Sequence, residues 1–384
     1  MKWEKVRLGE LYSVHNGLSK GSKFFGTGYP FLSFSTVFNN YFIPDELTDL
    51  VQSNEKEQDN YSILRGDVFV TRTSETSDEL GMSCVALKDY PNATYNGFTK
   101  RMRPIDNNRV LPEYIGYYMR TPLFRGEFRA FSTMTTRASL KNEDLLGLTV
   151  ALPPVEAQKK IANILRHYDQ LIENNQKQIK LLEESAQRLY KEWFVDLRFP
   201  GYENVDIING VPEGWSKTNL FEIAPIVTGK KDANFGAADG KYPFFTCAQE
   251  PIKAPSYSFD CDAVILAGNG DFNVKLYRGQ FEAYQRTYVF SPYNSENIYL
   301  LYYAVKDNMR QLFQGASGST IKFLTKRMLD EILVSQPNGE VLSSFNKICK
   351  VFQKKIEILR AKILLAQEAR DRLLTKLMSG ELEV

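Results

Sequence analysis

Histidine and cysteine, which build many metal sites and catalytic centres, are scarce in this chain of 384 residues. Its two histidines, His15 and His167, are too few to favour a zinc site or a histidine-based catalytic cluster. Its four cysteines form no C-x-x-C pair, so we expect them to be reduced and buried. These shortages argue against a zinc-stabilised or disulfide-stapled domain.

Long apolar runs are missing too. No run reaches 18 apolar residues, so the sequence predicts no membrane-spanning helix. The opening MKWEKVRLGEL lacks the apolar core of a secretion signal, and we therefore expect a cytoplasmic protein. A hydrophobic content of 43% and a charged content of 24% are typical of a globular protein, and the length favours at least two domains.

Catalytic and nucleotide-binding motifs are absent from the sequence. GKK at residues 229–231 lacks the leading glycine and the Ser or Thr of a P-loop. GNG at residues 268–270 lacks the third glycine of a dinucleotide-binding fingerprint, and neither G-x-S-x-G nor H-E-x-x-H occurs. The sequence therefore favours a binding protein over an enzyme.

A long amphipathic helix is predicted over residues 154–194. Its apolar residues alternate in steps of four and three for more than four heptads, the pattern of a helix that packs along a partner helix. One polar residue, Asn175, interrupts the pattern. The full seam is Ile161, Leu165, Tyr168, Ile172, Asn175, Ile179, Leu182, Ala186, Leu189 and Trp193.

A second seam follows 184 residues later and matches the first without a gap. At about 1.5 Å of rise per residue, each seam is on the order of 50 Å long. Two unrelated helices would not share this phase, so we infer a duplication whose two helices pack together as a long spacer. The second seam is Phe345, Cys349, Phe352, Ile356, Leu359, Ile363, Ala366, Arg370, Leu373 and Leu377, with Arg370 as its one charged member.

The segment before the first helix has the short strands and turns of a mixed α/β domain. Gly, Pro and Asn separate its strand-like runs. The predicted strands are residues 29–34, 67–71 and 83–87, and the predicted helices are residues 114–131 and a short capped helix at 139–145.

A second segment of the same kind begins near Trp215 and keeps the order of the first. The matching runs are 3–8 with 215–220, 29–31 with 242–244, 66–70 with 261–265, 114–118 with 299–303, and 150–153 with 334–337. The chain is therefore predicted to be one unit used twice. A shared frame with divergent loops suggests one task performed on two different targets.

Charge is segregated although the net charge is only +2. Residues 45–79 carry ten acids and three bases, whereas residues 95–141 carry nine bases and three acids. This can produce a basic face, and ordinary surface ion pairs can produce the same pattern. Polar loops recur at matching places in both halves, and their side chains suit phosphate oxygens and base edges. The candidate DNA contacts are Lys20, Lys23, Arg72, Ser74, Lys100, Arg101 and Arg137 in the first half, and Lys230, Lys231, Asn269, Tyr284, Arg286 and Lys322 in the second.

Several sequence blocks resemble the DNA-specificity subunit of type I restriction–modification enzymes. The most diagnostic is LPPVEAQKKIANIL at residues 152–165, which opens the first helix. The second copy departs from it, since QPNGE at residues 336–340 lacks the double proline and the glutamine. The other matching blocks are GDV at 66–68, NGFT at 96–99, SLK at 139–141, LYKEWF at 189–194 and GVPEGW at 210–215.

The resemblance implies an α+β (mixed α/β) fold with an internal pseudo-twofold repeat. Target-recognition domains at residues 1–152 and 215–336 would each read one half of a bipartite site in double-stranded DNA. Long helices at 153–197 and 337–384, joined through a connector at 198–214, would pair as an antiparallel coiled coil and set the spacer. The chain itself would be non-catalytic, bind no cofactor and remain off membranes. Its partners would be two methyltransferase (modification) subunits and the restriction/translocase subunits, which would bind S-adenosylmethionine and ATP.

Two other interpretations stay open on the residues alone. A duplicated coiled-coil scaffold could bind proteins rather than DNA through its α/β ends. The chain could instead be a nuclease or a methyltransferase with an unrecognised site. Against a methyltransferase, Pro153 and Pro154 lack the flanking Asn or Asp and the aromatic residue that are usual in adenine methyltransferases. The sequence carries no readable code for the bases that would be recognised.

Overall fold

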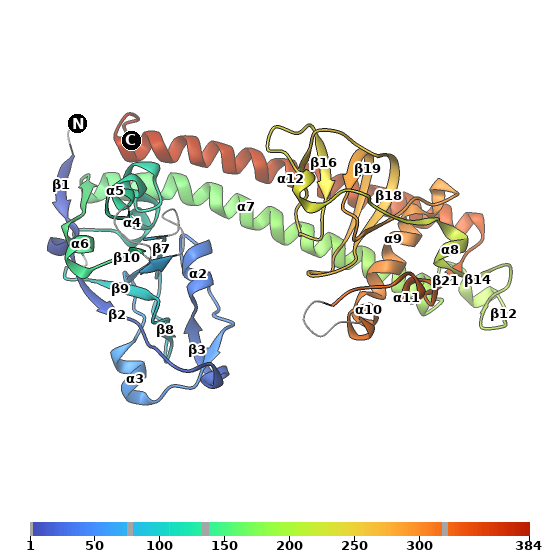
Figure 1. The fold of residues 1–384 in the computed structure, drawn as a ribbon, viewed down its shortest axis with the longest axis horizontal. Coiled ribbons are helices and arrows are strands. Elements are labelled where there is room, and N and C mark those ends of the chain that lie inside the picture. The colour runs from blue at the N-terminus through green and yellow to red at the C-terminus, as the bar shows by residue number, and fades with distance from the viewer. Residues whose placement is uncertain (1–2, 75–79, 107, 133–137, 317–321) are drawn as a thin grey trace. The chain divides into compact units, whose positions relative to one another are not determined.

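The computed structural model describes residues 3–74, 80–106, 108–132, 138–316 and 322–384 (Figure 1). The chain divides into two compact units. Unit 1 consists of Met1–Asn174 and Lys362–Val384, and unit 2 consists of Asn175–Ala361. Both ends of the chain therefore belong to unit 1.

Two long helices, α7 (Val155–Tyr190) and α12 (Gly339–Ser379), confirm the predicted helical pair. One stretch of π-helix, η2 (Lys191–Val195), continues α7. The carbonyl of Pro154 accepts a hydrogen bond from the Gln158 amide at 3.0 Å. The prolines therefore lie just before the first turn of α7, where their missing N–H groups and fixed φ cost nothing.

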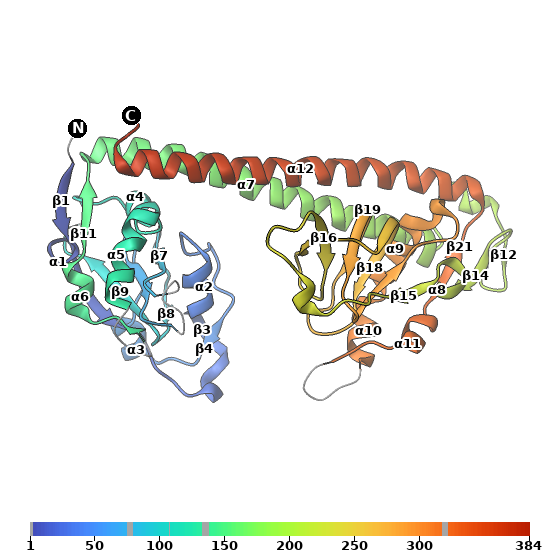
Figure 2. The same ribbon diagram turned by 45° about the horizontal axis from the view of Figure 1, so that its top comes forward.

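Within each unit the segments of α7 and α12 lie side by side and run in opposite directions (Figures 1 and 2). In unit 2, Glu183 pairs with Arg360, and Trp193, ten residues later, packs on Phe345. In unit 1, Ile161 shares a core with residues near the end of α12. All twenty seam positions are buried or half-buried, as residues of a packed seam would be.

An antiparallel sheet of four strands forms the centre of unit 1. Its two faces differ because successive side chains of a strand point to opposite sides. Val68, Val70 and Met102 belong to the core on one face, and Phe69 and Cys84 belong to the core on the other. In spatial order the strands are β2 (Tyr12–Asn16), β9 (Thr99–Pro104), β5 (Val68–Thr71) and β7 (Ser83–Val85).

Helices cover the first face of this sheet, and a second layer covers the other. α4 (Pro112–Tyr118) and α5 (Pro122–Ser132) share the first core with the beginning of α7. Leu32, Val37 and Tyr95 contribute to the core on the second face. That layer consists of β3 (Phe25–Leu32), α2 (Phe34–Asn39), β4 (Leu50–Val51), α3 (Glu55–Asn60) and β8 (Thr94–Tyr95).

Short elements complete unit 1. β1 (Glu4–Arg7) pairs antiparallel with β11 (Thr149–Leu152), the strand that leads into α7. β6 (Thr73–Ser74) pairs with β10 (Ala138–Ser139) at one end of the sheet. The remaining elements are α1 (Leu8–Leu11), η1 (Ser22–Phe24) and α6 (Asn142–Gly147).

Unit 2 repeats this plan on a sheet of six strands. In spatial order they are β15 (Ile226–Thr228), β20 (Thr287–Phe290), β18 (Phe259–Ala267), β19 (Val274–Ala283), β16 (Tyr242–Phe245) and β17 (Ile252–Ala254). The helices are α8 (Leu220–Ile223), α9 (Ile298–Asp307), α10 (Met309–Gly315) and α11 (Lys326–Asp330). The short elements are η3 (Tyr202–Asn204), β12 (Ile207–Ile208), β13 (Val211–Pro212), β14 (Ser216–Asn219), η4 (Ala233–Phe235), η5 (Ser295–Asn297) and β21 (Leu333–Gln336).

Strand registers confirm the duplication. Val6 opposes Val150 in the β1–β11 pair, as Thr218 opposes Val334 in the β14–β21 pair. β3 and β16 each make a two-residue parallel pairing, with β8 and with the end of β19. Both units therefore have the same backbone frame.

One predicted match was wrong by a single residue. The sequence alignment placed Asp67 opposite Asp262 in the repeat. Val68 opposes Met102 in unit 1, and Val264 opposes Phe290 in unit 2, so Val68 corresponds to Val264 and Asp67 to Ala263. Because side chains alternate between the faces of a sheet, this one-residue shift assigns each side chain of the strand to the core on the wrong face.

Three predicted boundaries also differ. β3 ends at Leu32, because the Ser33 hydroxyl accepts from the Thr36 amide and caps α2. The helix predicted over 114–131 is split, and the hydroxyl of Thr121 accepts from the Phe124 amide at 3.2 Å to start α5. α6 begins at Asn142 rather than 139, and its N-cap residue, Lys141, makes no side-chain cap.

Candidate nucleic-acid interface

Three backbone segments meet at one end of the sheet in unit 1, and we call them edge 1: residues 72–74, 96–98 and 138–141. The Arg72 amide donates to the Phe98 carbonyl at 3.0 Å, and the Leu140 amide donates to the Arg72 carbonyl at 3.0 Å. The turn is closed by the Thr99 amide, which donates to the Asn96 carbonyl at 3.0 Å. Edge 1 is therefore a connected surface built from three distant parts of the sequence.

The same hydrogen bonds recur in unit 2 at edge 2: residues 268–270, 284–286 and 322–325. The Gly268 amide donates to the Arg286 carbonyl at 2.9 Å, and the Leu324 amide donates to the Gly268 carbonyl at 2.8 Å. The Thr287 amide closes the turn onto the Tyr284 carbonyl at 2.8 Å. Phe98 and Arg286 therefore occupy equivalent positions, as do Arg72 and Gly268.

Glycines hold a further strand against each turn. A Cβ on Gly17 would lie 2.0 Å from the Asn96 carbonyl oxygen, and a Cβ on Gly229 would lie 2.0 Å from the Ala283 carbonyl oxygen. No side chain fits at either distance, so the chain after β2 and after β15 can approach this closely only as glycine. The chain just after each glycine thereby lies beside its edge, where Leu18 bridges to Asn96 and Lys231 bridges to Tyr284.

Several of the basic residues predicted to contact DNA in the first half are buried or already paired, so fewer exposed cations surround edge 1 than the sequence suggested. Arg72 is half-buried, and its Nε has no hydrogen-bond partner among the described residues. Lys20 is held by Glu57 at 2.7 Å and by the Gln52 carbonyl, whereas Lys23 is exposed beside the Phe24 ring. The side chain of Ser74 and all of Arg137 lie outside the described part of the chain.

An open hollow of about 560 Å³ lies beside edge 1. Arg72, Lys100 and the exposed Lys141 contribute its basic groups, and Glu143 is the acid in its lining. The hollow is polar and shallow, which suits a charged chain such as a phosphate backbone better than an apolar ligand.

Edge 2 carries most of the predicted residues of the second half. Arg286 and Lys230 are exposed, and Lys231 lies over the Phe235 ring at 4.4 Å. Lys322 lies over the Phe313 ring at 4.2 Å.

Asn269 and Tyr284 of edge 2 are held by backbone pairing. Asn269 pairs with Phe323, and its amide oxygen accepts a hydrogen bond from the Cys247 thiol. Tyr284 is half-buried in the bridge to Lys231. The structure thus brings together residues that the sequence scatters over more than ninety positions.

Lys100 and Arg101 are the clearest departure from the expected exposure of DNA contacts. Their exposed fractions are 6% and 7%. Lys100 donates to the Asn142 side chain, and Arg101 donates to the Ser62 carbonyl at 2.7 Å. Burial lowers the pKa of both groups. Direct DNA contact by these side chains stays a prediction, and their burial favours a structural role.

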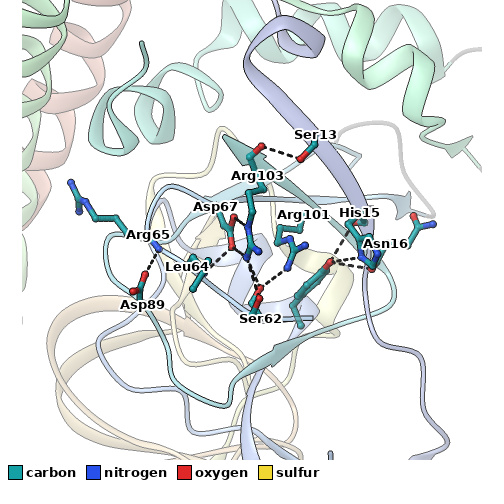
Figure 3. Close-up of polar contacts among 11 residues, drawn as sticks. Ser13, His15, Asn16, Ser62, Leu64, Arg65, Asp67, Asp89, Arg101 and Arg103 are labelled. Atoms are coloured by element: carbon teal, nitrogen blue, oxygen red, sulfur yellow. Dashed lines mark hydrogen bonds and ion pairs between the residues drawn. The ribbon is translucent and has the colours of Figure 1, made fainter. Parts of the chain in front are cut away.

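An ion pair with a buried carboxylate supports β9 at the end of the strand away from edge 1 (Figure 3). Asp67 is fully buried, and its carboxylate accepts from Arg103 Nε at 2.8 Å and from its Nη2 at 2.7 Å. The Leu64 amide also donates to this carboxylate, and Ser62 accepts from both arginines of β9. The hydrogen bond to Asp67 raises the pKa of Arg103. The Asp of the GDV block thus organises the strand, a role that the sequence reading missed.

The charged member of the second seam, Arg370, also has a partner in unit 1. Its guanidinium donates to Asp169 at 2.7 Å and lies over the Tyr41 ring, and Tyr117 donates to the same carboxylate. Burial alone would lower the pKa of Arg370, but the interactions with Asp169, Tyr41 and Asp371 together outweigh it, so the pKa is raised. This network fixes the helical pair to α4, and the seam pattern gave no sign of Asp169.

Gln158, the glutamine of the most diagnostic block, is 1% exposed. Its Oε1 accepts from the Leu111 amide at 2.9 Å, and its Nε2 donates to the carbonyls of Arg109 and Pro153 at 3.0 Å. It therefore fastens the start of α7 to the loop before α4. The second copy has the buried Leu342 at the matching position, 184 residues on.

Two other features are missing from the part of the chain that the structure describes, a metal-binding cluster and a membrane-spanning helix. No group of three or more His, Cys, Asp or Glu side chains is placed to hold a metal ion there. None of the helices in the described ranges combines the length and apolarity needed to cross a membrane.

Comparisons with known proteins agree with this architecture. A family model described as the type I restriction modification DNA specificity domain matches residues 1–184 and 212–366. The specificity subunit of the type I restriction enzyme EcoDI from Escherichia coli is 35% identical over 176 residues, 45% of this chain and 39% of that protein. The MjaIX specificity subunit from Methanocaldococcus jannaschii is 22% identical over 418 residues, 100% of this chain and 94% of that protein.

A solved structure shares the fold. The crystal structure of the S subunit of a type I restriction-modification system from M. genitalium gives a TM-score of 0.56 at 16% identity. The alignment covers 98% of this chain and 96% of that one. Because the family model matches both repeats and most of the sequence, this chain belongs to the type I restriction–modification DNA-specificity family.

Proposed function

We propose that each unit of this specificity subunit reads one half of a bipartite site in double-stranded DNA. The observation that carries the proposal is the pair of equivalent edges, which share their backbone hydrogen bonds and differ in their side chains. Arg72, Asn96 and Phe98 stand in edge 1 where Gly268, Tyr284 and Arg286 stand in edge 2. A rigid frame that carries two different sets of side chains can recognise two different base sequences with the same binding geometry.

Affinity and specificity would come from different residues. Exposed cations such as Lys23, Lys141 and Lys230 are suited to phosphates, and each phosphate contact would make binding more sensitive to salt. Base-edge contacts from the turns would give specificity, at about 1–3 kcal/mol for each good contact. Asp67 and Gln158 would act by positioning the strands and helices that present these groups.

The finer organisation follows the sequence prediction. The target-recognition domains would be residues 1–152 and 215–336, and the paired helices would set the spacer between the half-sites. The helices would also dock two methyltransferase subunits, and exposed apolar residues spaced by seven on α12, Val351, Ile358 and Leu365, support a protein contact there. S-adenosylmethionine and ATP would bind to the partner subunits, and this chain would be non-catalytic.

Methylation mapping tests the proposal. The chain would be co-expressed with a cognate type I methyltransferase, and methylated adenines would be mapped on plasmid DNA. A single split motif with a fixed gap is the expected result. A continuous motif, or no methylation by an assembled complex, would contradict it.

A salt titration separates the proposal from a protein-binding scaffold. Fluorescence anisotropy of a labelled mixed-sequence duplex would be measured with the assembled complex, and with the methyltransferase subunits alone, at two salt concentrations. The proposal predicts that adding this chain strengthens binding and steepens its dependence on salt. A scaffold would leave both quantities unchanged.

A further inference from the structure

We propose that Phe98, at the tip of edge 1, is a specificity-determining residue that packs against a thymine in the first half-site. The inference rests on the proposed function and deepens it, because it names the base and the chemistry of the contact. Phe98 belongs to the NGFT block but was not among the candidate DNA contacts, because phenylalanine is ordinarily a core residue.

Phe98 is exposed and nevertheless held in place. Its exposed fraction is 60%, although phenylalanine is among the residues most often buried. Its amide donates to the Asn96 side chain at 2.7 Å, and its carbonyl accepts from the Arg72 amide at 3.0 Å. A ring presented on a fixed backbone loses little conformational freedom when it binds.

The turn beneath Phe98 is tightly packed. A Cβ on Gly97 would lie 2.2 Å from the Ser19 hydroxyl and 3.0 Å from the Leu18 carbonyl oxygen. The backbone of the turn is thus pressed against residues 17–19. Phe98 carries the bulky side chain that this turn presents to solvent.

The residue at the equivalent position of edge 2 indicates what Phe98 does. The same place on the same turn is occupied by the exposed Arg286, whose guanidinium has the donors to read a guanine edge. A phenylalanine in that place cannot donate a hydrogen bond. The apolar feature that the major groove offers is the 5-methyl group of thymine, and phenylalanine is one of the side chains that contact it.

The surroundings favour DNA over a protein partner at this position. The Arg72 amide donates to the Phe98 carbonyl, and Arg72 lines the polar hollow together with the exposed Lys141. Cations beside the turn that carries the ring would provide phosphate contacts next to a base contact, which is how nucleic-acid sites combine affinity with specificity. An apolar protein interface would place such charges at its rim only.

The experiment compares selected DNA sequences for four chains in complex with the methyltransferase: wild type, Phe98→Ala, Phe98→Leu and Arg286→Ala. Each complex would select from duplexes randomised across both half-sites. Phe98→Ala should lose the preference for thymine at one or two positions of the first half-site and keep the second half-site intact. Phe98→Leu, which keeps apolar bulk, should retain part of the preference, and Arg286→Ala should affect only the second half-site.

Deoxyuridine then tests the methyl group itself. Replacing the affected thymine by deoxyuridine should weaken binding of the wild type by roughly five- to tenfold, the scale of one base contact. The same replacement should leave the affinity of Phe98→Ala unchanged. Since Phe98 is exposed, its variants should fold normally, and an unchanged thermal unfolding curve would verify this.

The possible failures are distinguishable. A split preference in the wild type that Phe98→Ala leaves unaltered at every position would overturn this inference and leave the proposed function standing. If the wild type selects a split site but Phe98→Ala does not assemble with the methyltransferase, Phe98 contacts a protein, and this result would also overturn the inference. A wild type without any split preference would defeat the proposed function first.

Discussion

Units 1 and 2 share a backbone frame and fill it with different chemistry. β9 carries Lys100, Arg101 and Arg103 where β20 and the residue after it carry Tyr288, Val289 and Ser291. The two strands have the same register against their neighbours. Hydrogen bonds of the main chain and close glycine contacts therefore define the frame, and the side chains within it are free to vary. A basic run in such a strand is weak evidence for a binding surface.

The helical pair is also attached differently in the two units. Unit 2 uses aromatic packing, in which Phe345 is fully buried with ring centroids 4.8 Å from Phe194 and 6.0 Å from Trp193. Unit 1 uses the polar network of Asp169, Arg370 and Tyr117. The stability gained from aromatic packing comes from removing apolar surface from water. The stability gained from the polar network is lost when any one of its members is removed.

Phe345→Ala should have the largest effect on stability. Removing a fully buried aromatic side chain leaves a cavity, and we expect the free energy of unfolding of unit 2 to fall by about 4 kcal/mol. Native-state hydrogen exchange of α9 and of the adjoining part of α12 would measure it. Val351→Ala, at an exposed position of α12 in the same unit, is the matched control and should change little. A small effect of Phe345→Ala would show that aromatic packing does not hold this unit.

Arg370→Ala should destabilise unit 1 by about 3 kcal/mol, because it leaves Asp169 largely buried without its partner. Hydrogen exchange in α4 and the start of α7 is the readout. Arg360→Ala removes the exposed ion pair with Glu183 in unit 2 and should cost less than about 1 kcal/mol. Equal effects of the two changes would remove the distinction between the attachments.

Gly17→Ala and Gly229→Ala test the shared frame itself. Each added Cβ would collide with a backbone carbonyl, and we expect each change to cost about 2 kcal/mol in its own unit. Thermal unfolding followed by hydrogen exchange would assign the loss to a unit. The comparison would be contradicted if one substitution were tolerated and its counterpart were not.

Arg101→Val should have the smallest effect, because it installs the residue found at the equivalent place in unit 2. Apolar replacement of a buried charged group is often nearly neutral, so we expect a stability change within about 1 kcal/mol. The salt dependence of DNA binding by the complex should stay as in the wild type. A weaker salt dependence would show that Arg101 contacts a phosphate after all.

The sequence was sufficient for the architecture and only partly for the edges. Heptad spacing and the constant offset of 184 residues reveal the helical pair, because both depend on simple periodicity. The contacts of Asp169 and Gln158 were not predicted, because their partners lie far away in the sequence and belong to no periodic pattern. Arg101 looked like a surface cation because sequence alone does not show that Ser62 and the Tyr95 ring enclose it.

The most direct test of two independent edges on one frame is a methylation map of a chimaera. Residues 1–152 would be replaced by the matching segment of another family member, and the chain would be co-expressed with the same methyltransferase. The account predicts that one half of the methylated motif changes, while the other half and the gap stay as they were. A change in both halves, or in neither, would contradict it.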